Sequence, residues 1–148
     1  MDSNLISNWN AKVNQNDTIY HLGDFCFSDE HIGQSILDRL NGKKHLIIGN
    51  HDKVGTRLRG WESISHYKEV SIDGQFIILC HYAMRVWNKS HHGAIQLYGH
   101  SHGNLPGTNQ SLDVGVDCWD YSPITLTEIK RKLKTLPEYK NEDHHGRK

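Results

Sequence analysis

Four apolar stretches of this chain each end in a short polar segment rich in Gly, Asp, Asn and His. The segments are Gly23-Asp24, Gly49-Asn50-His51-Asp52, His81 and Gly99-His100-Ser101-His102. Short apolar runs that end in turn residues are typical of buried strands. In open α/β sheets, ligand-binding residues gather at the carboxyl ends of strands. The pattern therefore predicts an α/β domain in which these side chains meet at one edge of the fold and bind metal.

The remaining patterns support alternating helices and strands. Helices are expected over 5–13, from Ser28 or Asp29 to residue 40, and after the capping box Thr125-x-x-Glu128. Asp73-Gly74 is a strong signal for a two-residue hairpin turn. The expected strands cover residues 18–22, 45–48, 70–72, 76–80, 95–98 and 112–117.

Length and composition limit the organisation and the location of the protein. A chain of 148 residues suits one domain, assigned to 1–136, with a frayed tail at 137–148. The 17 basic and 17 acidic residues balance, so neither stable nucleic-acid binding nor a membrane surface is expected. The three cysteines form no CxxC pair, and no run approaches the roughly 20 apolar residues of a membrane span. We therefore expect a cytoplasmic protein.

The order of the four polar segments resembles the motif series of the calcineurin-like metallophosphoesterase superfamily. That series is Asp-x-His, Gly-Asp, Gly-Asn-His-Asp/Glu, His and Gly-His-x-His, and the likeness runs from about Leu5 to Leu136. It implies a β-sandwich flanked by helices, with metals held in loops at one edge. The Asp-x-His member is absent here, so the first strand of the sheet is expected to be missing. Asp29-Glu30-His31 and Asp143-His144-His145 match it by letter only, since both lie after the Gly-Asp motif.

The resemblance also implies the ligands of the metals. Asp24 would bridge two cations. Amide and imidazole groups would complete the two sites, from Asn50, His81, His100 and His102. His102 would reach toward the cation that also needs the Asp-x-His motif. The family holds two divalent ions, and such ligands accept Mn, Fe, Ni or Zn. A single retained ion is the alternative.

Other residues are expected to bind the substrate or to act on it. His51 would contact the phosphate and protonate the leaving oxygen, with Asp52 fixing its tautomer. Arg57 and Arg85 follow two of the motifs and would grip phosphate oxygens. Trp87 is left open between packing and stacking on a nucleotide base.

The predicted function is hydrolysis of small phosphodiesters or phosphomonoesters by a metal-activated water. The substrate would be a small phosphate ester or a nucleotide-like molecule. A relic that binds metal or phosphate with little turnover is the alternative, and a non-enzymatic domain is a third reading. The H-x-H comes too late in the chain for a metallo-β-lactamase, and the P-C-x-x-C of zinc deaminases is lacking. Homo-oligomerisation is left open, because an uncovered sheet edge favours pairing.

Overall fold

The computed structural model describes residues 2–25, 29–100, 105–115 and 122–140. Their elements follow in chain order: α1 (Asp2–Lys12), β1 (Thr18–His21), α2 (Glu30–Arg39), β2 (Lys43–Ile47), η1 (Gly55–Arg57), β3 (Trp61–Ser65), β4 (Tyr67–Ile72), β5 (Gln75–Cys80), η2 (Ser90–His92), β6 (Ile95–Tyr98), β7 (Ser111–Asp113) and α3 (Leu126–Leu133). None of the helices in these ranges has the length and apolar character of a membrane span.

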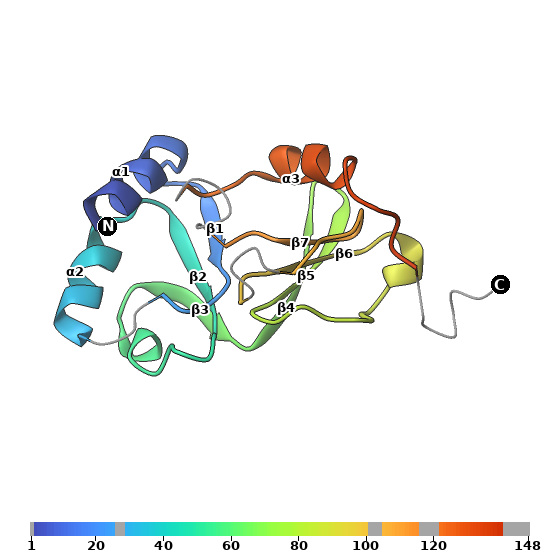
Figure 1. Ribbon diagram of the computed structural model, residues 1–148. Coiled ribbons are helices and arrows are strands. Elements are labelled where there is room, and N and C mark those ends of the chain that lie inside the picture. The colour runs from blue at the N-terminus through green and yellow to red at the C-terminus, as the bar shows by residue number, and fades with distance from the viewer. Residues whose placement is uncertain (1, 26–28, 101–104, 116–121, 141–148) are drawn as a thin grey trace.

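The strands form two sheets. One has the order β1-β2-β3, with both pairs parallel, and the other has the order β4-β5-β6-β7, with only β4 and β5 antiparallel. Figure 1 shows α1 and α2 beside the three-stranded sheet and α3 over the four-stranded sheet. This mixed α/β arrangement of two sheets and three helices agrees with the expected fold. The expected loss of a first strand stays a prediction.

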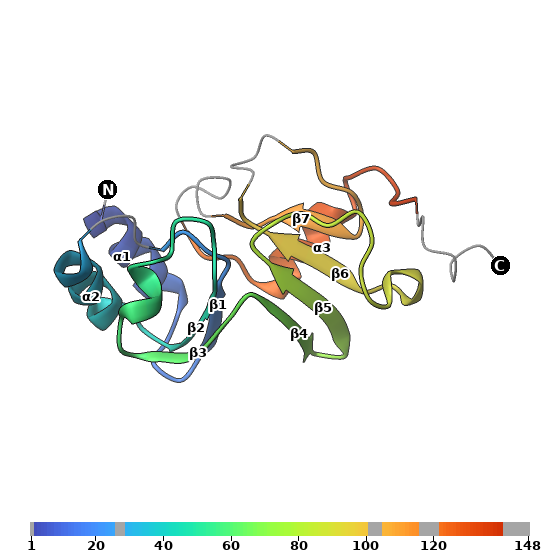
Figure 2. The ribbon, with the colours of Figure 1, turned by 90° about the horizontal axis from the view of Figure 1, so that it is seen from below.

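A shared apolar core joins the two sheets. Leu22, which follows β1, and Ile47 of β2 lie in one cluster with Ile77, Leu97 and Leu112 of the larger sheet. Figure 2 shows the two sheets side by side. Because β1 and β2 are parallel, as are β5 and β6, the carboxyl ends of each pair lie at one edge of their own sheet. The contact between His81, after β5, and the Leu22 carbonyl, after β1, brings these two edges together.

Alternation along β5 explains why this strand is buried on both sides. Ile77 and Leu79 face the core between the sheets, whereas Ile78 faces a second cluster with Trp87 and Ala94. This second cluster is formed by the segment that links β5 to β6, which folds back over the outer face of the sheet. Both faces of β5 are therefore shielded from water. His81, directly after this strand, is held in a fixed position by it.

Several local predictions are confirmed. Asp29 caps α2 by accepting hydrogen bonds from the backbone of His31 and Ile32, and Thr125 and Glu128 form the capping box of α3. Asp73 and Gly74 adopt positive φ angles of 49° and 79° in the β4–β5 turn. The alternative that Ser28 caps the helix falls on a residue outside the described ranges.

Two features differ from expectation. Strand β3 was not predicted, although Trp61–Ser65 alternates in burial as a strand does. The first residues of the predicted frayed tail are anchored: Tyr139 donates its hydroxyl hydrogen to the Arg85 carbonyl at 2.7 Å, and its backbone N–H bonds Asn109. Its ring also packs on Trp87 at 4.5 Å between centroids. The described part of that tail, 137–140, is thus attached to the domain.

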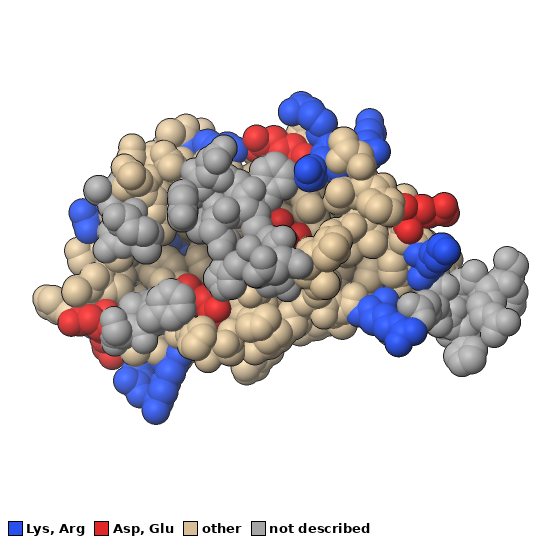
Figure 3. Space-filling model, in the orientation of Figure 1, with Lys and Arg blue, Asp and Glu red and all other residues tan. Residues whose placement is uncertain are grey.

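Charged side chains are distributed over the surface. On the face drawn in Figure 3, Lys and Arg lie in separate groups near the outline and alternate with acidic groups. The absence of stable nucleic-acid binding and the cytoplasmic location stay predictions.

Candidate metal centre

The loop after β1 brings Asp24 to the site in an unusual backbone conformation. Gly23 has a φ of 103° and Asp24 a φ of 59°. A Cβ on Gly23 would overlap His81 Nδ1 and lie 2.8 Å from Gly49 Cα. Only glycine fits this close approach. A positive φ is uncommon for a residue with a side chain, although Asp adopts it more readily than most, and such conformations cluster at functional sites.

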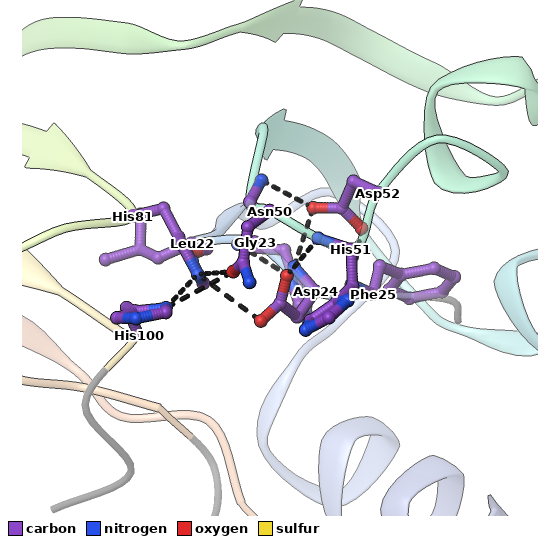
Figure 4. A network of polar contacts seen from close by, with 11 residues as sticks. Leu22, Gly23, Asp24, Phe25, Asn50, His51, Asp52, His81 and His100 are labelled. Atoms are coloured by element: carbon purple, nitrogen blue, oxygen red, sulfur yellow. Dashed lines mark hydrogen bonds and ion pairs between the residues drawn. The ribbon is translucent and has the colours of Figure 1, made fainter.

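Four ligand-type side chains converge at the carboxyl ends of the strands (Figure 4). His81 Nε2 lies 2.9 Å from Asn50 Oδ1, 3.1 Å from His100 Nδ1 and 3.3 Å from Asp24 Oδ2. His100 Nδ1 is also 3.2 Å from Asn50 Oδ1. The predicted ligands Asp24, Asn50, His81 and His100 are therefore brought together, although they come from four separate segments of the chain.

The orientation of His81 fixes which of its nitrogens faces the cluster. His81 Nδ1 is 2.6 Å from the carbonyl oxygen of Leu22. Because a carbonyl can only accept, Nδ1 carries the hydrogen, and in the neutral ring Nε2 presents its lone pair to the other side chains. Metal-binding histidines commonly use their second nitrogen in this way.

The donor set fits a divalent cation. The Asp24 carboxylate and the Asn50 carbonyl are acceptors, and a ring nitrogen of His81 lies within 3.3 Å of both. Lone pairs gathered this closely repel one another unless a proton or a cation lies among them. Oxygen and imidazole nitrogen together suit Mn, Fe, Ni or Zn. Asp24, His81 and His100 also offer ligand atoms within 4.8 Å of one another.

Asp52 holds the two ligand-bearing loops together. It is 1% exposed, and its Oδ2 accepts hydrogen bonds from the backbone N–H groups of Asp24 at 2.6 Å and Gly49 at 2.7 Å. Its Oδ1 accepts from the Phe25 N–H at 2.7 Å. The sequence did not indicate this scaffold role, and the expected role of Asp52 in fixing the tautomer of His51 stays a prediction. A local pattern shows only that the two residues are adjacent.

His51 is adjacent to the cluster in the structure. Its side chain is exposed, and its backbone N–H donates to Asp24 Oδ1 at 2.9 Å. This bond occupies one carboxylate oxygen of Asp24 and leaves Oδ2 directed toward His81 (Figure 4). The predicted catalytic histidine therefore adjoins the predicted metal ligands.

Contacts outside the ligand cluster are recorded for both predicted phosphate-binding residues. Arg57 lies on η1, and its guanidinium Nη1 is 4.0 Å from the Glu30 Oε1 of α2. Arg85 is exposed, and its backbone carbonyl binds Tyr139. Both assignments stay predictions.

The open question about Trp87 is settled by its burial. Trp87 is 4% exposed and donates its Nε1 hydrogen to the Ala94 carbonyl at 2.8 Å. It is therefore a packing residue and not a platform for a base. His102 and the sequence Asp143-His144-His145 fall outside the described residues, and the Asp29 side chain is used as the α2 cap.

Sequence reasoning missed contacts that depend on the tertiary fold. The Leu22 carbonyl that orients His81 comes 59 residues earlier in the chain, and a backbone group leaves no signal in a sequence. The buried Gln96 binds the segment after His81. Its one sequence signal was a polar residue inside the apolar run Ile95–Tyr98.

Comparison with known families identifies the class of protein. The family model of the calcineurin-like phosphoesterase superfamily domain matches residues 2–113, and the chain belongs to this superfamily. The resemblance inferred from the motifs is thereby confirmed.

Three individual proteins are similar to this chain. It is 30% identical over 143 residues to the uncharacterized protein MJ1445 of Methanocaldococcus jannaschii. The aligned region covers 90% of this chain and 76% of that protein. It is 22% identical over 173 residues to the Gene 66 protein of Mycobacterium phage D29, with 93% and 85% covered. The crystal structure of AQ665, a protein of unknown function from Aquifex aeolicus, matches with a TM-score of 0.68 at 24% identity, over 88% of this chain and 84% of that one. This last match supports the fold alone.

Proposed function

We propose that the protein is a metal-dependent hydrolase of small phosphodiesters or phosphomonoesters. One observation carries the proposal: ligand atoms of Asn50, His100 and Asp24 lie 2.9, 3.1 and 3.3 Å from the His81 Nε2 atom. Membership of the calcineurin-like phosphoesterase superfamily supports the same class of reaction.

The chain contributes the binding site and a proton donor. Asp24, Asn50, His81 and His100 would hold the cation, which when bound supplies positive charge for the phosphoryl oxygens and lowers the pKa of water. Asp52 keeps the Asp24 and Asn50 loops in register through backbone hydrogen bonds. His51, exposed beside the ligands, would protonate the leaving oxygen, because imidazole titrates near neutral pH.

A second candidate is a protein that binds one cation and turns over little or no ester. It is favoured because the described residues assemble ligands around a single position, whereas the family uses two cations. His102 would serve the second cation. The two candidates differ in turnover and in metal stoichiometry, so one experiment separates them.

The experiment combines metal analysis with a phosphodiesterase assay. Purified protein is loaded with Mn²⁺ or Zn²⁺, its metal content per chain is measured, and hydrolysis of bis(p-nitrophenyl) phosphate is followed. Two ions per chain with turnover that chelation abolishes support the hydrolase. One ion without turnover supports the binding protein. No bound ion and a melting temperature that metal leaves unchanged would contradict both, because a ligand of the folded state raises its stability.

A matched pair of variants ties the result to this cluster. Asp24→Ala should lose both metal and turnover, whereas Asp38→Ala, which removes an exposed carboxylate on α2, should keep both.

A further inference from the structure

An exposed aromatic ring lies directly against the ligand cluster. Tyr82 follows His81 in the chain and is 46% exposed. Its ring centroid is 4.9 Å from that of His81, in an edge-to-face arrangement, and 4.7 Å from that of His100. A large aromatic side chain left half in water beside two metal-ligand rings offers apolar surface that a bound molecule can cover.

A buried side chain holds the backbone of Tyr82 in place. Gln96 of β6 is fully buried; its amide donates to the Tyr82 carbonyl at 3.3 Å, and its Oε1 accepts from the Met84 N–H at 3.0 Å. The next residues are fixed in turn, because Trp87 is buried and bonded to Ala94. The ring is therefore presented by a fixed segment, which reduces the ordering cost when a ligand packs on it.

The position of this ring has a consequence for the substrate. The Tyr82 ring contacts the rings of His81 and His100, two of the four candidate ligands. The ester substituent of a phosphate bound at the cluster would therefore lie close to Tyr82. Planar groups stack on aromatic side chains, and every nucleobase has such a face. Trp87, which is buried, cannot serve this purpose.

We propose that Tyr82 is a specificity-determining residue that stacks on a planar aromatic substituent, so that the preferred substrates are nucleotides or other aromatic phosphate esters. The inference rests on the proposed function, because it assumes that a phosphate group binds at the Asp24–His81 cluster. It assigns the substituent to Tyr82 and leaves the role of the ligands unchanged.

The test compares two molecules with the same phosphonate group. Mn²⁺-loaded protein is titrated by calorimetry with the non-hydrolysable phosphonate analogues of adenosine 5′-monophosphate and of ribose 5-phosphate, which lacks the base. Wild-type protein should bind the nucleotide roughly ten-fold tighter or more, the usual scale for one stacked base. Tyr82→Ala should bring the two affinities within about three-fold by weakening only the nucleotide. Tyr82→Phe should keep the preference.

Controls separate stacking from damage to the metal site. Tyr67→Ala removes a tyrosine of comparable exposure, 40%, from β4 and should leave the preference unchanged. Manganese affinity is measured for each variant, and Tyr82→Leu, which keeps apolar bulk without a planar ring, is used if Tyr82→Ala does not fold.

The outcomes distinguish this inference from the proposed function. Wild-type protein that takes up no Mn²⁺ contradicts the proposed function and this inference with it. Protein that takes up Mn²⁺ and binds both ligands equally, or binds neither, overturns the stacking role alone. A nucleotide preference that survives in the Ala or Leu variant overturns it as well.

Discussion

The carboxylate of Asp52 accepts a hydrogen bond from the backbone N–H of Asp24 across 28 residues of sequence, at 2.6 Å. The same carboxylate binds Gly49 and Phe25, so one buried charge connects the loop after β1 with the loop after β2. A carboxylate that accepts several backbone hydrogen bonds is well satisfied despite its burial. The candidate metal ligands of the two loops therefore depend on a residue outside the candidate ligand set.

Asp52→Ala should destabilise the fold and also weaken metal binding. It leaves three N–H groups without their acceptor, at a cost of about 3 kcal/mol or more. Asp52→Asn should be intermediate, because the amide retains one oxygen but directs an NH₂ group at a backbone donor. Urea denaturation of the metal-free protein measures the stability, and calorimetric titration with Mn²⁺ measures the affinity. Wild-type stability and affinity in Asp52→Ala would show that Asp52 does not support the loops.

Gly49→Ala should weaken metal binding while leaving most of the fold intact. A Cβ at this position would lie 2.5 Å from Asp24 Oδ1 and 2.9 Å from His81 Cε1, so at least one ligand must move. The expected loss of Mn²⁺ affinity is about ten-fold or more, since displacing a ligand typically costs at least as much as losing its supporting contact.

The matched control for this glycine is Gly74→Asn in the β4–β5 turn. Gly74 has a φ of 79° and open space around it, and Asn tolerates this conformation. That variant should bind Mn²⁺ as the wild type does. Equal metal affinities in Gly49→Ala and the wild type would contradict the close approach at Gly49.

His51→Ala should separate metal binding from turnover. His51 contacts Asp24 through its backbone, which the substitution preserves, so the metal content should stay at the wild-type level. Loss of a general acid typically lowers kcat by about 100-fold or more. The decrease should be smaller for p-nitrophenyl esters, whose leaving group needs little protonation, than for alkyl esters. Loss of the metal together with the activity would show instead that the His51 side chain is a ligand.

The metal-free protein should lose stability as the pH falls below neutrality because of His21. This ring stacks near Trp9 at 6.4 Å and meets Phe25 edge-to-face at 5.2 Å, and its Nδ1 accepts a hydrogen bond from the Gly23 N–H. Burial lowers its pKa from 6.5 to about 4. Between these two pH values the unfolded chain binds more protons than the folded one, so stability falls as the pH falls from about 6.5 to about 4.

Urea denaturation at several pH values, with chelator present, measures this effect. His21→Phe keeps the aromatic packing and should flatten the part of the pH profile that His21 contributes, whereas the exposed His31→Phe should leave the profile unchanged. An identical profile in wild type and His21→Phe would contradict the assignment.

Local sequence patterns determined most of the secondary structure, although not β3, and the identity of the candidate ligands. The hairpin turn at Asp73-Gly74 and the caps of α2 and α3 depend on neighbouring residues, and the structure contains them all. Asp24, Asn50, His81 and His100 were recognisable because each follows an apolar strand, and parallel strands bring their carboxyl ends together.

Tertiary structure alone decided how those ligands are supported and what lies beside them. The bond from His81 to the Leu22 carbonyl, the role of Asp52 and the burial of Trp87 all join segments that are distant in sequence or depend on the packing of two sheets. A backbone carbonyl has no residue-specific signal, and the exposure of a tyrosine or tryptophan depends on what folds over it. The sequence therefore specified which groups could bind a metal, and long-range packing specified their orientation and the surface offered to a substrate.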